Sequence, residues 1–261
     1  MRLEDQTTDV VIIGAGVAGL RAAENLKQNN INFVVLEASH RIGGRAYSEK
    51  LGPENWFDLG CSYLHNGKLN PFVKIAKSLD IQVNTTNGDL FDATKTKYFS
   101  NGKKLEFQNL NPVESAYNEV IKKISHVHHD CSIFENMDMN NPYSPILLHL
   151  FSGSNAADSD LVSSRDYISS HYDGPDYPIP SSLGNLVKAW SSGINVNLNT
   201  VVKKIYWDDS SVKVVTSKGT FFAKKVLLTV STSILFKNDI TIIPELPAEK
   251  RKAIENLPMG T

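Results

Sequence analysis

Residues 9–45 read DVVIIGAGVAGLRAAENLKQNNINFVVLEASHRIGGR, and this stretch decides the fold. Asp9–Ile13 is a short apolar run bounded by polar residues, and Leu20, Ala23 and Leu26 then recur at helical spacing. The segment therefore predicts a strand, a glycine-rich turn and a helix, in that order.

The turn Gly14–Gly19 has the spacing G-x-G-x-x-G. In such a turn the first glycine permits a tight reversal, Gly16 lets the backbone approach a pyrophosphate, and Gly19 lets the helix pack closely on the strand. The start of the helix then offers unpaired N–H groups and a positive dipole end to phosphates. The alternative is that the glycines serve only as a reversal between strand and helix.

A second strand is predicted at Asn32–Leu36, and it ends at Glu37, which follows Gly16 by 37 − 16 = 21 residues. A carboxylate at this distance is expected to meet the hydroxyl groups of a ribose. Strand, helix, second strand and acid in register favour a dinucleotide-binding α/β domain over a plain reversal.

The segment RIGGR, residues 41–45, offers a second place for phosphate. Its two glycines permit close approach, and Arg45 can form charge-assisted hydrogen bonds to a phosphate oxygen. The alternative is that Arg41 and Arg45 are solvated surface charges.

The pattern E-x-x-x-R-x-G-G-R, which begins at Glu37, resembles the flavin-containing amine oxidases, a family that includes monoamine oxidases, polyamine oxidases and histone demethylases. Residues 56–67, WFDLGCSYLHNG, are similar to the family's next motif, which runs under the flavin and opens into the substrate cavity. The resemblance implies that Gly60–Ser62 lie against the cofactor and that His65 faces the substrate amine. A histidine satisfied by neighbouring backbone is the alternative for His65.

Later segments also resemble this family. Leu183–Leu198, followed by Thr200–Ile205, is similar to the family's return to the nucleotide domain, where the backbone of Val202 would touch the adenine. Val212–Thr216, Thr220–Ala223 and Lys225–Val230 alternate or run apolar, and they predict a small antiparallel meander that leads into a buried strand.

Two departures accompany these similarities. After Val230 the family normally has proline and, two positions later, glycine, whereas this chain has Ser231 and Ser233. Residues 244–260 again follow the family, but the lysine that holds a water near the flavin in relatives would come after Thr261.

The resemblance implies an FAD-binding Rossmann-like domain of residues 1–66 plus 184–236. It also implies an inserted α+β substrate domain, present in part as residues 67–183 plus 237–261. FAD is the expected cofactor, non-covalent as far as residues 1–261 show, since neither Cys61 nor Cys131 matches in position the family's covalent cysteine, which in relatives would come after Thr261. The residues expected to bind it are Gly14, Gly16, Val17, Ala18, Gly19, Glu37, Ala38, Arg41, Gly43, Gly44, Arg45, Gly60, Cys61, Ser62, Val202 and Thr229.

The middle of the chain predicts capped helices. Asn70-Pro71 and Asn111-Pro112 each precede apolar residues at helical spacing, and a short strand pair is expected near Lys97–Phe107. His126, His128 and His129 suggest a metal site, but histidines near the end of a helix also complement its dipole, and no metal is predicted.

Composition narrows the class of protein. The chain has 261 residues and a formal net charge of −1, which argues against nucleic acid as its main partner. Its two cysteines argue against a disulfide framework. No apolar stretch is long enough to span a membrane, and residues 1–6 lack the apolar core of a signal peptide. A cytoplasmic protein is therefore expected.

The predicted function is oxidation of an amine carbon–nitrogen bond by hydride transfer to FAD, with oxygen as the reoxidant. One alternative is a truncated, inactive flavin-binding remnant or half-protein, which would self-associate or need a missing C-terminal fragment. Another is an FAD-dependent enzyme similar to desaturases or protoporphyrinogen oxidases. The expected partner is a small-molecule amine.

Overall fold

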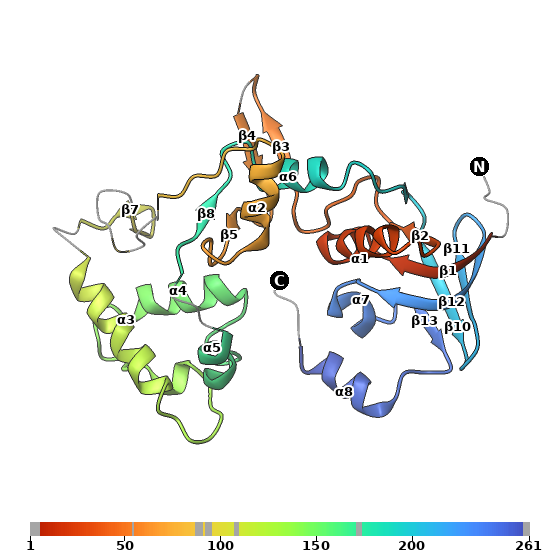
Figure 1. Cartoon of the computed structure of the whole chain (residues 1–261). Helices are drawn as coiled ribbons and strands as arrows, with labels where there is room; N and C mark the ends of the chain where they lie inside the picture. Colours follow the sequence, from red (N-terminus) through yellow and green to blue (C-terminus); the bar gives the residue numbers. More distant parts are fainter. Residues whose placement is uncertain are drawn as a thin grey trace. The chain divides into compact units, whose positions relative to one another are not determined.

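The computed structural model describes residues 6–53, 55–86, 91, 96–106, 110–170 and 174–257 (Figure 1). The described residues form two compact units, one made of residues 6–85 and 176–257, and one made of residues 86–175. Residues 67–85, 176–183 and 237–257 thus pack with the first unit, whereas the sequence placed them in the substrate domain. The functional division into cofactor and substrate domains remains a prediction.

A seven-stranded sheet organises the first unit, in the order β13-β10-β11-β12-β1-β2-β9. β12, β1, β2 and β9 are parallel, whereas β10, β11 and β12 form an antiparallel meander and β13 runs parallel to β10. This confirms the predicted α/β class. The strands are β1 (Gln6–Ile13), β2 (Phe33–Leu36), β9 (Val196–Asn197), β10 (Val202–Trp207), β11 (Val212–Thr216), β12 (Thr220–Leu228) and β13 (Thr241–Ile243).

The two faces of β1 enter different cores. Ile12 packs with Leu20 and Ala23 of α1 (Val17–Gln28), so this helix covers one face of the parallel strands. On the other face Val11 and Ile13 pack with residues of the meander, among them Val214 and Phe221. A strand buried on both faces explains why Val10–Ile13 is continuously apolar instead of alternating.

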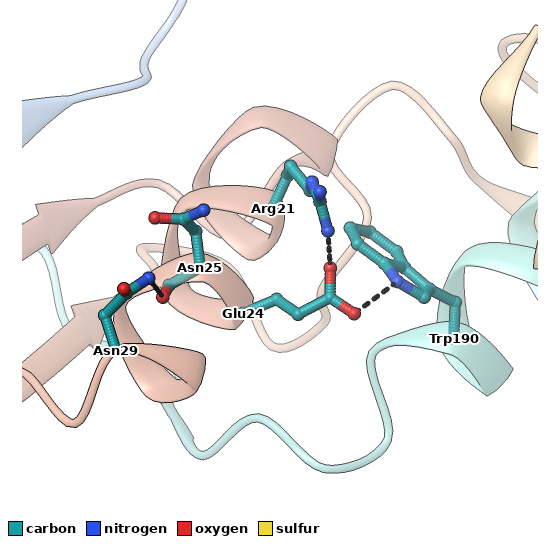
Figure 2. Close-up of polar contacts among 5 residues, drawn as sticks. All are labelled: Arg21, Glu24, Asn25, Asn29 and Trp190. Carbon is teal, nitrogen blue, oxygen red and sulfur yellow. Dashed lines mark hydrogen bonds and ion pairs between the residues drawn. The ribbon is translucent and has the colours of Figure 1, made fainter.

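A polar contact ties α1 to α6 (Leu183–Trp190), the helix with which the chain returns to the sheet. Figure 2 shows the Glu24 carboxylate between Arg21 and Trp190, and the indole Nε1 of Trp190 donates to Glu24 Oε1 at 3.2 Å. Val187 and Trp190 of this helix also pack in the same core cluster as Leu20 and Ala23 of α1.

The predicted meander forms, with one difference. β12 continues without a break from Thr220 to Leu228, whereas the sequence suggested two separate segments. The strand is antiparallel to β11 at its start and parallel to β1 along most of its length, so it links the meander to the parallel strands. After β12 the chain forms α7 (Thr232–Phe236), with Ser231 as the N-cap residue.

Smaller elements complete the first unit. β3 and β4 form a hairpin, and β5 pairs with β8. Asn70 caps α2 as predicted, since its Oδ1 accepts the N–H of Phe72 at 3.0 Å. These elements are β3 (Ser48–Leu51), β4 (Asn55–Asp58), β5 (Tyr63–Leu64), α2 (Pro71–Ser78), β8 (Tyr177–Pro178) and α8 (Ala248–Glu255).

The second unit has its own helical core, in which the Tyr117 ring stacks on that of Phe151 at 5.0 Å. The expected strand pair is present as β6 and β7. The predicted cap at Asn111 differs from the structure, since Asn111 is the first residue of α3 and Leu110 is the N-cap residue. Its elements are β6 (Phe99–Ser100), β7 (Lys103–Lys104), α3 (Asn111–Ile124), η1 (Phe134–Asn136), α4 (Ser144–Asn155) and α5 (Ser164–Ser170).

Two properties of the described residues bear on function. No helix there is long and apolar enough to cross a membrane. No group of three or more histidine, cysteine or acidic side chains in that part of the chain is arranged to hold a metal ion, and His126 instead contacts the carbonyl oxygen of Lys122 at 2.7 Å.

Candidate dinucleotide-binding site

The three glycines of the first turn have different structural roles. Gly14 has a φ of +105°, and a Cβ built on Gly19 would lie 2.0 Å from the carbonyl oxygen of Gly14. These two glycines are therefore required by backbone conformation and by packing. Gly16 has an ordinary φ of −71°, and a Cβ there would meet nothing within 4 Å. Packing within the described protein does not explain a glycine at position 16.

The turn leads into the exposed N-terminus of α1. Gly16 is the N-cap residue, no side chain caps the helix, and its first turn has no acidic residue. Val17 is half-buried and Ala18 is exposed. The first N–H groups of a helix have no partner within it and lie at the positive end of its dipole, so this end of α1 is suited to an anion.

Glu37 lies at the end of β2 and faces the first turn. Its Oε2 accepts the N–H of Ala15 at 2.7 Å, and its Oε1 accepts the N–H of Ser39 at 2.9 Å. The carboxylate is half-buried, and the adjacent Ala38 is exposed. Each carboxylate oxygen has a second lone pair, so these backbone bonds leave acceptor capacity for a hydroxyl group.

The second glycine turn packs directly on the first. The N–H of Gly43 donates to the carbonyl oxygen of Ala15 at 2.8 Å, and Gly43 and Gly16 form an isolated parallel β-bridge. A Cβ on Gly44 would lie 3.2 Å from the Cα of Gly16. The sequence predicted both turns, and the structure places them side by side.

The two arginines of RIGGR have different surroundings. Arg45 is exposed, and its guanidinium has no hydrogen-bond or ion-pair partner among the described residues. Arg41 folds back on its own turn, where its Nη1 donates to the carbonyl oxygen of Gly44 at 2.9 Å and its guanidinium carbon lies 3.7 Å from the centroid of the Tyr47 ring.

Gly60–Ser62 joins the same surface through the backbone of Arg45. The N–H of Cys61 donates to the Arg45 carbonyl oxygen at 3.1 Å, and a Cβ on Gly60 would lie 1.8 Å from that oxygen. The glycine at position 60 is thus required by contact with Arg45. Cys61 is exposed and Ser62 is half-buried.

Thr229 and Val202 support the site from the sheet. The Thr229 hydroxyl donates to the carbonyl oxygens of Ile13 and Gly14, both at 3.0 Å. Val202 starts β10, and its side chain is buried in a core cluster formed by residues of the meander and of the parallel strands. Only the backbone of Val202 is thus suited to contact a ligand.

His65 lies opposite an acidic residue that the sequence did not single out. The antiparallel pairing of Leu64 with Tyr177 continues to His65 and Asp176, whose Nδ1 and Oδ1 are 3.0 Å apart. One contact of His65 is therefore with a carboxylate, whereas the alternative interpretation of the sequence expected neighbouring backbone. Because the two residues are 111 positions apart, only the strand pairing brings them together.

Sequence reasoning missed three further residues that shape the site. Ala15 and Ser39 provide the N–H groups that Glu37 accepts, and the N–H of Thr200 donates to the carbonyl oxygen of Glu37 at 2.8 Å. A serine two positions after an acid is a recognisable turn signal, which could have indicated Ser39. The Ala15 and Thr200 contacts use the backbone and leave no signal in side-chain type.

These parts together form an exposed surface with a helix N-terminus, two glycine turns, an unpaired arginine and an acid at a strand end. Such a surface can receive a phosphate group and a ribose, as in α/β folds that bind dinucleotides.

Comparison with known proteins leads to the same class of protein. A family model described as flavin containing amine oxidoreductase matches residues 17–171 and 146–261. The chain belongs to this family of oxidoreductases, which makes FAD its cofactor.

Individual relatives are similar to the chain at a modest level. It is 26% identical to "Probable polyamine oxidase 4" of Arabidopsis thaliana, over 96% of this chain and 56% of the relative. It is also 26% identical to "Lysine-specific histone demethylase 1 homolog 2" of the same plant, over 96% of this chain and 36% of the relative. The chain thus spans about half the length of the polyamine oxidase.

Solved structures support the fold. A wild-type putrescine oxidase bound to putrescine matches with a TM-score of 0.73 at 17% sequence identity, over 96% of this chain and 64% of that one. An A394C mutant of putrescine oxidase also gives a TM-score of 0.73, over 96% of this chain and 63% of that one, at 17% identity. At this level of identity the likeness establishes a shared fold.

Proposed function

We propose that the chain holds FAD on the surface made by Gly14–Gly19, Glu37 and Gly43–Arg45, and that the protein oxidises the carbon–nitrogen bond of a small-molecule amine. When bound, FAD supplies the hydride acceptor, and oxygen restores its oxidised form. The relatives named as polyamine oxidases support an amine as the substrate.

Gly16 is the observation that carries the FAD proposal. Its backbone conformation is accessible to any residue, and its missing side chain leaves open space beside an uncapped helix N-terminus. A pyrophosphate that approaches the backbone there explains the glycine. Arg45 can then donate charge-assisted hydrogen bonds to phosphate, and Glu37 can accept from the ribose.

The test compares two glycine variants. Gly16→Ser retains a good N-cap residue, so we expect the FAD-free protein to unfold within about 0.5 kcal/mol of wild type. We expect its affinity for FAD, measured by titration with flavin fluorescence, to fall at least about tenfold, because the new side chain occupies the space for phosphate. The matched control is Gly19→Ala, which should destabilise the FAD-free protein through the Gly14 oxygen. Wild-type affinity in Gly16→Ser would contradict the proposal.

A second candidate is a flavin-binding protein that does not turn over amines until another strand joins its sheet. β11 pairs with β12 only as far as Ala223, whereas β1 pairs with it as far as Leu228. Among the described strands, none pairs with the other side of Lys224–Leu228, and Leu227 there is 39% exposed. An unpaired strand side is a template for a further strand from a second copy or from another segment.

Peroxide detection with a panel of amines separates the two candidates. Peroxide formed by the 261-residue chain in monomeric form would support amine oxidation without a further strand. Bound flavin without peroxide, together with light scattering that shows a monomer, would support the second candidate. A flavin-bound dimer would point to self-association through the open side of β12.

We also propose a cytoplasmic location. It is supported by two free thiols, since Cys61 is exposed and neither it nor Cys131 forms a disulfide. Fractionation of cells that express the tagged protein tests this location.

A further inference from the structure

We propose that Arg41 is a positioning residue that holds the second glycine turn in shape, in contrast to Arg45, which the proposed function places on the cofactor's phosphates. The sequence predicted both arginines as FAD-binding residues and assigned the phosphate contact to Arg45, but it gave Arg41 no separate role. The inference rests on the proposed FAD site and assigns separate roles to two of its residues.

The described contacts of Arg41 are with its own turn and with residues on either side of it. Its Nη1 donates to the carbonyl oxygens of Gly44 at 2.9 Å and Ile42 at 3.4 Å, and its guanidinium lies over the Tyr47 ring. Its own carbonyl oxygen accepts the Ser39 hydroxyl at 2.7 Å. Arg41 therefore links the start of the turn to its middle and to its end.

The turn needs such a link because its backbone conformation is unusual. Gly43 has a φ of +97° and Gly44 a φ of +56°. Two consecutive glycines lose much conformational freedom when they are ordered, so contacts from outside must hold them. Because Gly43 and Gly44 pack on Ala15 and Gly16, a shift of the second turn would also change the first.

The chemistry of the contacts fits arginine and excludes lysine. A planar guanidinium can stack on an aromatic ring while its N–H groups reach two carbonyl oxygens, and an ammonium cannot reproduce this geometry. At Arg45, by contrast, the described residues provide no partner, so only its charge and donors are available to a ligand. A lysine can replace much of that role as a point charge.

The experiment uses four variants, Arg41→Lys, Arg41→Met, Arg45→Lys and Arg45→Met, each titrated with FAD at several salt concentrations. We expect both Arg41 variants to bind FAD about tenfold more weakly with the wild-type salt dependence, since no phosphate contact is lost. We expect Arg45→Met to bind weakly with a reduced salt dependence, and Arg45→Lys to recover most of the affinity. Recovery of FAD affinity in Arg41→Lys, or a reduced salt dependence of FAD binding in Arg41→Met, would overturn the positioning role of Arg41.

A second measurement needs no cofactor. In the FAD-free proteins we expect faster hydrogen exchange at the amides of Gly43 and Ala46 in both Arg41 variants, because these N–H groups bond within and beneath the turn. Arg45→Met should exchange like wild type, and equal exchange in all four variants would refute the positioning role. If wild type binds no FAD, the proposed function fails, while this measurement still decides the role of Arg41.

Discussion

The Glu37 carboxylate accepts the backbone N–H of Ala15 at 2.7 Å, across 22 positions of sequence. The same carboxylate accepts the N–H of Ser39, so its two oxygens link the first glycine turn to the segment that follows β2. The acid that the sequence assigned to a ribose therefore also has a structural role, and substitutions at position 37 test both.

Glu37→Gln should weaken this link. A glutamine side chain has one acceptor oxygen, and its amide group would face one of the two backbone N–H groups. We expect the FAD-free protein to lose about 1–3 kcal/mol of unfolding free energy, measured by urea denaturation, and to bind FAD more weakly. Glu119→Gln, an exposed change on α3, is the matched control. Unchanged stability in Glu37→Gln would show that the two bonds do not support the turn.

Thr229→Val should loosen the first turn from the sheet. Valine has the shape of threonine but cannot donate to the carbonyl oxygens of Ile13 and Gly14. We expect a loss of about 1 kcal/mol in unfolding free energy and weaker FAD binding. Thr229→Ser retains the hydroxyl group, so it should bind FAD more tightly than Thr229→Val. Equal affinity in the two variants would dismiss the hydroxyl bond as a support for the site.

Asp58→Asn should weaken the attachment of α6. The Asp58 carboxylate accepts the N–H of Leu183 at 3.1 Å and the hydroxyl of Ser48 at 2.5 Å, at the N-terminus of the helix. Asparagine loses the charge that favours this end of a helix and one acceptor oxygen, so we expect a loss of about 2 kcal/mol in urea denaturation. Asn55→Ala, an exposed change on the same strand, should be close to neutral. A neutral Asp58→Asn would contradict the proposed attachment.

The ion pair of Asp9 with Lys224 should make stability depend on pH. The hydrogen bond to Lys224 lowers the pKa of Asp9, and the same bond raises the pKa of Lys224. The Asp9 contribution is present above the ordinary aspartate pKa of about 3.9 and is lost as the pH falls through the lowered value. The Lys224 contribution is present below about 10.4 and is lost as the pH rises through the raised value.

Asp9→Asn should therefore reduce the dependence of the thermal unfolding midpoint on pH at both extremes. The effect should be small, because the Lys224 side chain is exposed, that of Asp9 is only half-buried, and β1 also pairs with β12 along its backbone. Identical pH profiles for wild type and Asp9→Asn would show that the pair contributes nothing.

His65→Ala tests the proposed substrate contact. If the side chain meets the amine, we expect normal FAD content and an amine KM raised by about tenfold, the effect of one lost hydrogen bond. Steady-state peroxide production gives KM, and the visible spectrum gives flavin content. His128→Ala, on an exposed histidine distant in sequence from these motifs, is the control and should change neither. An unchanged KM in His65→Ala would remove it from the substrate site.

The sequence by itself determined the cofactor-binding half of the fold. Gly14 and Gly19 have no room for a side chain, and the alternation of strands and helix before Glu37 follows from apolar periodicity, so these features are local and can be recognised from residue type and spacing. The Asn70 cap and the meander were predictable for the same reason.

Only the tertiary structure decided which predicted residues work together. The packing of Gly43 on Gly16, the pairing of His65 with Asp176 and the different surroundings of Arg41 and Arg45 depend on contacts between segments that are distant in sequence, or on the path of a single turn. Residue type is the same for both arginines. Their roles differ because a carbonyl group and an aromatic ring lie within reach of Arg41, whereas no described partner lies within reach of Arg45.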